Sequence, residues 1–182
     1  RFYRARYAGR TFFSKGLDYL KRRKLLKFDK LDVGKEYLLF LPNKQNSYRQ
    51  IIISPNYVNN AQIVEELANS LPERYTLVVK DHPHVYRGAI DYRMIQVVKK
   101  NLNCKYIDPY KYLTEDIIAG AKAVVVVAST SIMEALVQLK PVLAFGERPE
   151  LVNVDPPIVR KVDSVSQLSQ YFAEITEASP EV

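Results

Sequence analysis

The run Ala123–Val127, an alanine followed by four valines, constrains the fold of this chain more than any other feature. Continuous β-branched residues are typical of a strand that is buried on both faces, and such strands occur in parallel sheets covered by helices. The run Thr76–Val79 is a second segment of this kind. Both are far shorter than the roughly 20 apolar residues of a membrane-spanning helix. We therefore predict that both belong to one parallel sheet.

Strand-like and helix-like patterns alternate from residue 34 onward. Strands are predicted at 36–41, 75–79, 105–107, 123–127, 141–145 and 158–162, and helices at 59–71, 91–102, 114–119, 130–139 and 164–176. Between the first strand and the first helix we expect a polar loop through Tyr48 and a short apolar run at 51–53. The order predicts an α/β fold, a Rossmann-like parallel sheet with helices on both faces.

Composition predicts one globular domain with a basic amino-terminal arm. The 182 residues, of which 47% are hydrophobic, suffice for one well-buried core. Residues 1–30 carry eleven basic and two acidic side chains, a net charge of +9, whereas residues 31–182 carry 16 basic and 18 acidic ones, a net charge of −2. We therefore separate an arm at 1–33 from an α/β domain at 34–182. Because the sequence begins at Arg1, we expect a piece of a longer protein.

Aromatic residues are interleaved with the basic ones in the arm, and their spacing predicts one or two helices. Two interpretations stay open: a solvated helix packed on the domain, or a helix lying on an anionic membrane surface. Nucleic acid is the least favoured partner, because no nucleic-acid-binding motif accompanies the charge. The single cysteine, Cys104, excludes an intramolecular disulfide and suits the reducing cytoplasm.

Right-handed crossovers place the carboxyl ends of parallel strands on one rim of the sheet, where open α/β sheets bind ligands. Four loops should therefore converge there, with a fifth segment possible at 146–148. The four loops are 42–48, 80–88, 108–114 and 128–131. Polar clusters in two of these loops carry the candidate site.

The first cluster holds Lys80 and His82 directly after a predicted strand. Pro83 biases the preceding residue toward an extended conformation, which fixes the direction of the imidazole. An imidazole can donate to a phosphate oxygen or, when protonated, offset the charge of a departing phosphate. We therefore take His82 as the candidate catalytic residue, and Lys80, His82 and Pro83 as nucleotide-binding residues. His84 is expected to be a solvent or supporting residue.

The second cluster, Ser129, Thr130 and Ser131, lies where the chain leaves a strand and enters a helix. Free N–H groups and hydroxyls at such a point suit a phosphate, but serine and threonine are also ordinary helix caps. Glu134 follows Thr130 by one helical turn, so its carboxylate could accept hydrogen bonds from a ribose. The sequence has neither a G-x-G-x-x-G nor a Walker pattern, which disfavours a standard dinucleotide fold and a P-loop ATPase.

Tyr48, Arg49, Tyr86 and Arg87 are weaker candidates for base stacking or phosphate contact, and surface positions explain them equally well. No metal-ligand spacing occurs around Cys104, and we predict no metal site. No cofactor is expected, because the nucleotide at this rim would be a substrate.

Four motifs occur in order between residues 36 and 150: LVVKDHP at 77–83, YIDP at 106–109, VVASTSIMEAL at 126–136 and KPVLAFG at 140–146. Together they resemble the carboxyl-terminal half of bacterial capsular-polysaccharide glycosyltransferases of the two-Rossmann GT-B architecture. The resemblance implies that this half binds the sugar nucleotide. It also implies that His82, Ser129 and Thr130 hold phosphate and that Glu134 holds the ribose. Similar sialyl- and Kdo-transferases use CMP-activated sugars.

The resemblance favours the donor-binding domain of an inverting glycosyltransferase in cell-surface or capsular polysaccharide synthesis. Members of the family also have an acceptor-binding domain that residues 1–35 are too short to form, so we expect a missing domain or a partner chain. Two alternatives stay open: a non-catalytic module that binds a phosphorylated metabolite, and an enzyme resembling UDP-sugar epimerases. The protein is expected in the cytoplasm, with the arm on the inner face of the membrane. The sequence does not identify the base, sugar, acceptor or oligomeric state.

Overall fold

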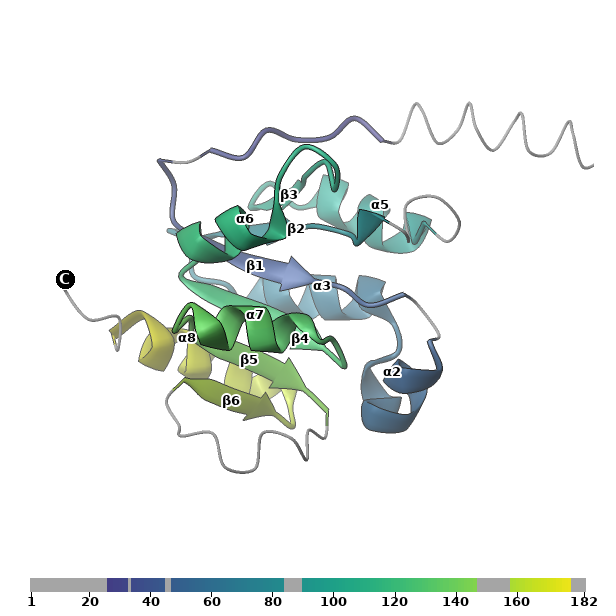
Figure 1. The fold of residues 1–182 in the computed structure, drawn as a ribbon, viewed down its shortest axis with the longest axis vertical. Helices are drawn as coiled ribbons and strands as arrows, with labels where there is room; N and C mark the ends of the chain where they lie inside the picture. The colour runs from purple at the N-terminus through teal and green to yellow at the C-terminus, as the bar shows by residue number, and fades with distance from the viewer. Residues whose placement is uncertain (1–25, 33, 45–46, 84–89, 147–157, 178–182) are drawn as a thin grey trace, which may run out of the picture.

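A six-stranded parallel sheet forms the centre of the computed structural model (Figure 1). The structure describes residues 26–32, 34–44, 47–83, 90–146 and 158–177. The strands are β1 (Tyr37–Leu41), β2 (Thr76–Val79), β3 (Cys104–Tyr106), β4 (Ala123–Val127), β5 (Val142–Phe145) and β6 (Val159–Val162). They lie in the order β3-β2-β1-β4-β5-β6, and each neighbouring pair is parallel. This is the Rossmann strand order, so the predicted Rossmann-like sheet is confirmed.

Helices cover both faces of the sheet, as predicted (Figure 1). One face carries α3 (Asn60–Ser70), α5 (Tyr92–Lys100) and α8 (Leu168–Glu177), and the other carries α6 (Thr114–Gly120) and α7 (Ser131–Val137). Each face has its own apolar cluster, and the residues of β4 alternate between the two clusters. Among the described helices, none has the length and apolar character needed to cross a bilayer.

Local sequence explains the position of α3. The side-chain oxygen of Asn59 accepts hydrogen bonds from two backbone amides of the first turn, which caps the helix. Ile63, Val64 and Leu67 are at most 1% exposed and face the sheet. Burying side chains of this size stabilises the fold by about 1.5–3 kcal/mol each.

The segment 48–53 differs from its prediction. It forms a short helix, α2 (Tyr48–Ile53), in place of a polar loop and an apolar run. The hydroxyl of Ser47 accepts the backbone N–H of Gln50 at 3.1 Å, which is the spacing of a capping box. The side chain of Gln50 is fully buried, and its amide nitrogen donates to the carbonyl of Tyr57 at 2.8 Å. These contacts favour a helix over a loop.

Helix α7 is shorter than the predicted helix at 130–139 because of a left-handed residue at its end. Leu139 has a φ of 53°. Its N–H donates to the carbonyl of Leu136 at 2.9 Å, and the N–H of Lys140 donates to that of Ala135 at 2.9 Å. This is the hydrogen-bond pattern of a Schellman motif, which ends a helix.

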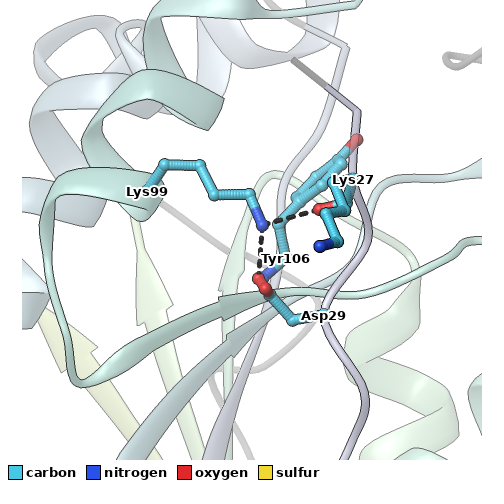
Figure 2. A network of polar contacts seen from close by, with 4 residues as sticks. All are labelled: Lys27, Asp29, Lys99 and Tyr106. Atoms are coloured by element: carbon cyan, nitrogen blue, oxygen red, sulfur yellow. Dashed lines mark hydrogen bonds and ion pairs between the residues drawn. The ribbon is translucent and has the colours of Figure 1, made fainter. Parts of the chain in front are cut away.

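Asp29 attaches the segment 26–32 to the edge strand β3 (Figure 2). Its backbone N–H donates to the carbonyl of Tyr106, and its carboxylate accepts the N–H of Tyr106, each at 2.8 Å. The ammonium of Lys99 lies 2.7 Å from the same carboxylate and 2.7 Å from the carbonyl of Lys27. Residues 26–32 therefore form a bridge to the sheet and are not helical, contrary to the predicted arm helix. The remainder of the arm, 1–25, lies outside the described residues.

Candidate functional site

A pocket of about 360 Å³ opens at the rim where β1, β2 and β4 end. This is the point where the strand order reverses, the usual ligand position in open α/β sheets. The polar side chains that line the pocket are Asn43, Lys44, Lys80, Asp81, His82, Thr114, Ser129, Thr130, Ser131 and Glu134. The two clusters singled out in the sequence therefore meet in one pocket.

Lys80 is a nearly buried cation in this pocket. It follows β2 directly and is 3% exposed. Its ammonium donates to the Oγ1 atom of Thr114 at 2.9 Å, and no carboxylate in the described part of the chain lies within 4.0 Å of it. Burial lowers the pKa of Lys80, whereas nearby carboxylates, Glu134 first, oppose this shift. An ammonium has three donors, so Lys80 retains hydrogen-bonding capacity for an anionic ligand.

Asp81 is also 3% exposed and is the neighbour of Lys80. The hydroxyl of Tyr106 donates to its Oδ2 atom at 2.6 Å. Burial raises the pKa of Asp81 to about 6, and the charge of Asp91 adds to this effect. The hydrogen bond from Tyr106 and the charge of Lys80 act in the opposite direction. A carboxyl group that titrates near neutral pH therefore lies beside the buried cation.

His82 lines the pocket with an exposed side chain. Pro83 is not among the lining residues, but its carbonyl accepts the hydroxyl of Tyr110 at 2.8 Å. This contact joins the loop after β2 to the loop after β3. His84 lies outside the described residues. The geometry places the imidazole of His82 where a ligand in the pocket can reach it.

The hydroxyl cluster forms a local network at the start of α7. The hydroxyl of Ser129 accepts the backbone N–H of Ser131 at 3.3 Å, and it donates to the Oγ of Ser131 at 3.2 Å. Thr130 is the residue before the helix, and its side chain makes no capping hydrogen bond. Glu134, in the first turn of α7, lines the pocket with an exposed side chain. Because the helix has only seven residues, its dipole should contribute less to the binding of an anion than the hydroxyls and the ammonium of Lys80 do.

The chain enters this network through Ala128, a buried residue with a φ of 47°. A left-handed conformation costs a residue other than glycine about 1–2 kcal/mol. Such strain persists where surrounding contacts impose it, and it is concentrated at functional sites.

Several lining residues were missed by the sequence analysis. Asn43, Lys44 and Thr114 lie in loops that were expected at the rim, but no local pattern distinguishes them from other loop residues. Asp81 was present in the motif without a role. Among the described residues, no three metal-ligating side chains gather at one place.

Of the weaker candidates, the described structure places only the side chain of Tyr48. Tyr48 lies on α2, is 81% exposed and is not part of the lining. The side chain of Arg49 is not described, and Tyr86 and Arg87 lie outside the described residues, as do Glu147 and Arg148 of the fifth segment.

The family model for capsule polysaccharide biosynthesis proteins matches residues 4–149 of the 182. The chain belongs to this family. The match covers the pocket and extends into most of the segment that we separated as an arm. No curated protein is similar enough in sequence to count as a relative of this capsule-family domain.

Solved structures with a similar fold include sugar-nucleotide enzymes. The UDP-GlcNAc 2-epimerase of Methanocaldococcus jannaschii, in complex with UDP-GlcNAc and UDP, is 19% identical at a TM-score of 0.53, over 81% of this chain and 40% of that one. KpsC of Thermosulfurimonas dismutans, a β-Kdo 2,7-transferase, is 20% identical at a TM-score of 0.51, over 84% of this chain and 50% of that one. The UDP-GlcNAc 2-epimerase of Neisseria meningitidis, bound to UDP-GlcNAc, is 17% identical at a TM-score of 0.51, over 92% of this chain and 43% of that one.

At these identities the likeness establishes the fold alone. The capsule-family domain spans half or less of the length of each of the three structures. It is a Rossmann-type domain of the capsule polysaccharide biosynthesis family.

Proposed function

We propose that this domain binds the donor sugar nucleotide of a glycosyltransferase in capsule polysaccharide synthesis. The observation that supports it most is Lys80, a buried ammonium without a carboxylate partner in the described chain, in a pocket at the switch point of the sheet. A buried charge is costly unless it is paired. The phosphate of a nucleotide would supply the missing negative charge.

The other lining residues suit the remaining parts of such a ligand. His82 and the hydroxyls of Ser129 and Thr130 lie around the same cavity and can donate to phosphate oxygens. The carboxylate of Glu134 can accept hydrogen bonds from the ribose. In this proposal the base is a pyrimidine and the nucleotide is CMP or UDP. The sequence resemblance to sialyl- and Kdo-transferases implies a CMP-linked sugar, and two similar epimerases were solved with UDP-GlcNAc.

During transfer, the bond between the anomeric carbon and the phosphate oxygen breaks as an acceptor hydroxyl attacks the carbon and passes its proton to a base of the acceptor-binding domain or partner chain. The electron pair of the broken bond stays on the phosphate, where Lys80 offsets the developing charge and the imidazole of His82 donates a hydrogen bond to a phosphate oxygen. Donors placed in this way are most effective in a cavity that excludes water. The acceptor would bind to a second domain or partner chain, and the basic residues at 1–30 would favour an anionic membrane surface.

Titration calorimetry with CMP and UDP tests the nucleotide site. We expect the unmodified chain to bind at least one of them, and His82→Ala and Lys80→Met each to weaken that binding about 10²-fold or more. Lys80→Met should unfold at the same or a higher urea concentration, because it removes a buried charge. This result would exclude misfolding as the reason for lost binding.

Lys122→Met is the matched control for the loss of one lysine charge. Lys122 pairs with Glu36 at 2.8 Å, away from the pocket lining, so the variant should retain the affinity of the unmodified chain. The proposal would be rejected if neither nucleotide bound, or if His82→Ala and Lys80→Met bound as tightly as Lys122→Met.

The likeness to the two epimerases favours epimerisation of a UDP-sugar as the second candidate function. Incubation with UDP-GlcNAc and no acceptor should leave the sugar unchanged if the domain serves a transferase. An epimerised product would favour the alternative.

A further inference from the structure

A single backbone conformation directs the hydroxyl cluster toward the pocket. Ala128 has a positive φ at the point where the chain leaves β4, and Ser129 to Ser131 follow it directly. Ala128 is 1% exposed and has a methyl side chain, so it lacks the freedom of glycine at positive φ. An external contact is needed to hold the turn in this conformation.

Asn43 supplies that contact from the loop after the neighbouring strand β1. Its Nδ2 atom donates to the carbonyl of Ala128 at 3.1 Å, across 85 residues of sequence. Its Oδ1 atom accepts the backbone N–H of Lys44 at 2.8 Å. Both partners are backbone groups with a fixed donor or acceptor character, so only this orientation of the amide satisfies both.

A buried polar network holds Asn43 itself in place. The Nδ2 atom of Asn60 donates to the carbonyl of Asn43 at 3.0 Å. The Nε2 atom of Gln50 lies 3.3 Å from the Oδ1 atom of Asn60 and 2.8 Å from the carbonyl of Tyr57. Asn60 is 1% exposed and Gln50 is fully buried. The start of α3 and helix α2 therefore fix the loop after β1, which in turn reaches the loop after β4.

We infer that Asn43 is a positioning residue for the phosphate site. It holds Ala128 in the left-handed conformation and thereby aims the hydroxyls of Ser129 and Ser131 at the ligand. The inference rests on the proposed nucleotide site for its effect on affinity, but the conformational effect belongs to the ligand-free chain. It also gives a reason for the buried network behind the pocket, since Gln50 and Asn60 do not line the pocket themselves.

The test compares Asn43→Ala, Ala128→Gly and the double variant with the unmodified chain. Titration with CMP and UDP should show about tenfold weaker binding for Asn43→Ala, equal to about 1.4 kcal/mol. The double variant should bind the nucleotide at least about threefold more tightly than Asn43→Ala, because glycine adopts a positive φ without a stabilising contact. A purely structural contribution of Asn43 to stability would not be relieved in this way.

A second readout needs no ligand. In the NMR spectra of the free chain, Asn43→Ala should shift the Cα and Cβ resonances of Ala128 toward the values of a negative φ. Asn103→Ala is the matched control, since the Nδ2 atom of Asn103 donates to the carbonyl of Ala68 at 3.1 Å, away from the pocket lining. It should change neither the Ala128 resonances nor the affinity.

The outcomes separate the two proposals. If the unmodified chain bound neither nucleotide, the proposed function would fail, and the Ala128 resonances alone would decide the role of Asn43. If those resonances were unchanged in Asn43→Ala, or if Ala128→Gly restored no affinity in that variant, the positioning role would be wrong.

Discussion

At the scale of single residues, the pocket combines two buried groups of opposite charge that do not form an ion pair. Lys80 directs its ammonium to Thr114, whereas the carboxyl group of Asp81 accepts a hydrogen bond from Tyr106. Separating the two groups leaves the cation available to a ligand. The cost appears at Asp81, whose ionised form is disfavoured by burial.

This cost predicts a pH dependence of stability. The pKa of Asp81 is about 6 in the folded chain and about 3.9 in an unfolded one, so the folded state binds more protons between these values. Stability from this group is therefore greatest below about pH 4 and is lost as the pH rises through 6. Asp81→Asn keeps an acceptor for the hydroxyl of Tyr106 and should be about 3 kcal/mol more stable than the unmodified chain at pH 7.5.

Urea unfolding of the two chains at pH 4, 5.5 and 7.5 measures this difference. The gap between them should be small at pH 4 and should widen with each step in pH. A gap of constant size would mean that the carboxyl group is not shifted by burial, and a less stable variant at pH 7.5 would reverse the expected sign.

At the scale of elements, the end of α7 carries strain that the fold does not require. Leu139 occupies the left-handed position of the Schellman motif with a side chain that is 77% exposed. Glycine is the preferred residue there. Leu139→Gly should raise the free energy of unfolding by about 0.5–1 kcal/mol, because the relief of backbone strain exceeds the entropy cost of glycine.

Leu102→Gly is the control for this prediction. Leu102 is 98% exposed and does not have a positive φ, so glycine should lower stability there by up to about 1 kcal/mol. Urea or thermal unfolding measures the change in the free energy of unfolding of both variants. Equal losses in the two variants would show that the left-handed position of Leu139 carries no strain.

At the scale of the whole molecule, the parts that could be predicted from the sequence depend on local patterns. The continuous apolar residues of β4 indicate burial on both faces, and parallel pairing then places the loops after β2 and β4 on one rim. This reasoning needs no knowledge of particular contacts. It sufficed to bring Lys80 and Ser129 to the same pocket.

The parts that could not be predicted depend on contacts between distant residues. The role of Asn43 comes from a carbonyl 85 positions away, and the burial of Asp81 is coupled to Tyr106, 25 positions away. Helix α2 has a local capping signal at Ser47, but its stability depends on the burial of Gln50 against Asn60 and Tyr57. A loop residue shows no periodic pattern that would reveal such partners.

The arrangement of the core predicts how the molecule opens. Cys104, on the edge strand β3, is 5% exposed and belongs to the apolar cluster that also includes residues of β5, β6 and α8. Burial raises the pKa of its thiol to about 12, so it should react with a thiol reagent only after exposure. Because one apolar cluster joins this edge of the sheet to the opposite edge at β6, we expect global unfolding to be the main route to labelling of Cys104.

The urea dependence of Cys104 labelling measures the surface exposed in the opening reaction, and it should match that of global unfolding. Asp29→Ala removes the contacts of the Asp29 carboxylate with Tyr106 and Lys99, which help to hold residues 26–32 on β3. Labelling of this variant should become faster and less dependent on urea, since β3 can then open locally. Asp163→Ala, which removes an ion pair with Lys161 at the other edge, should leave the urea dependence unchanged. A weak urea dependence in the unmodified chain would mean that β3 already opens independently of the sheet.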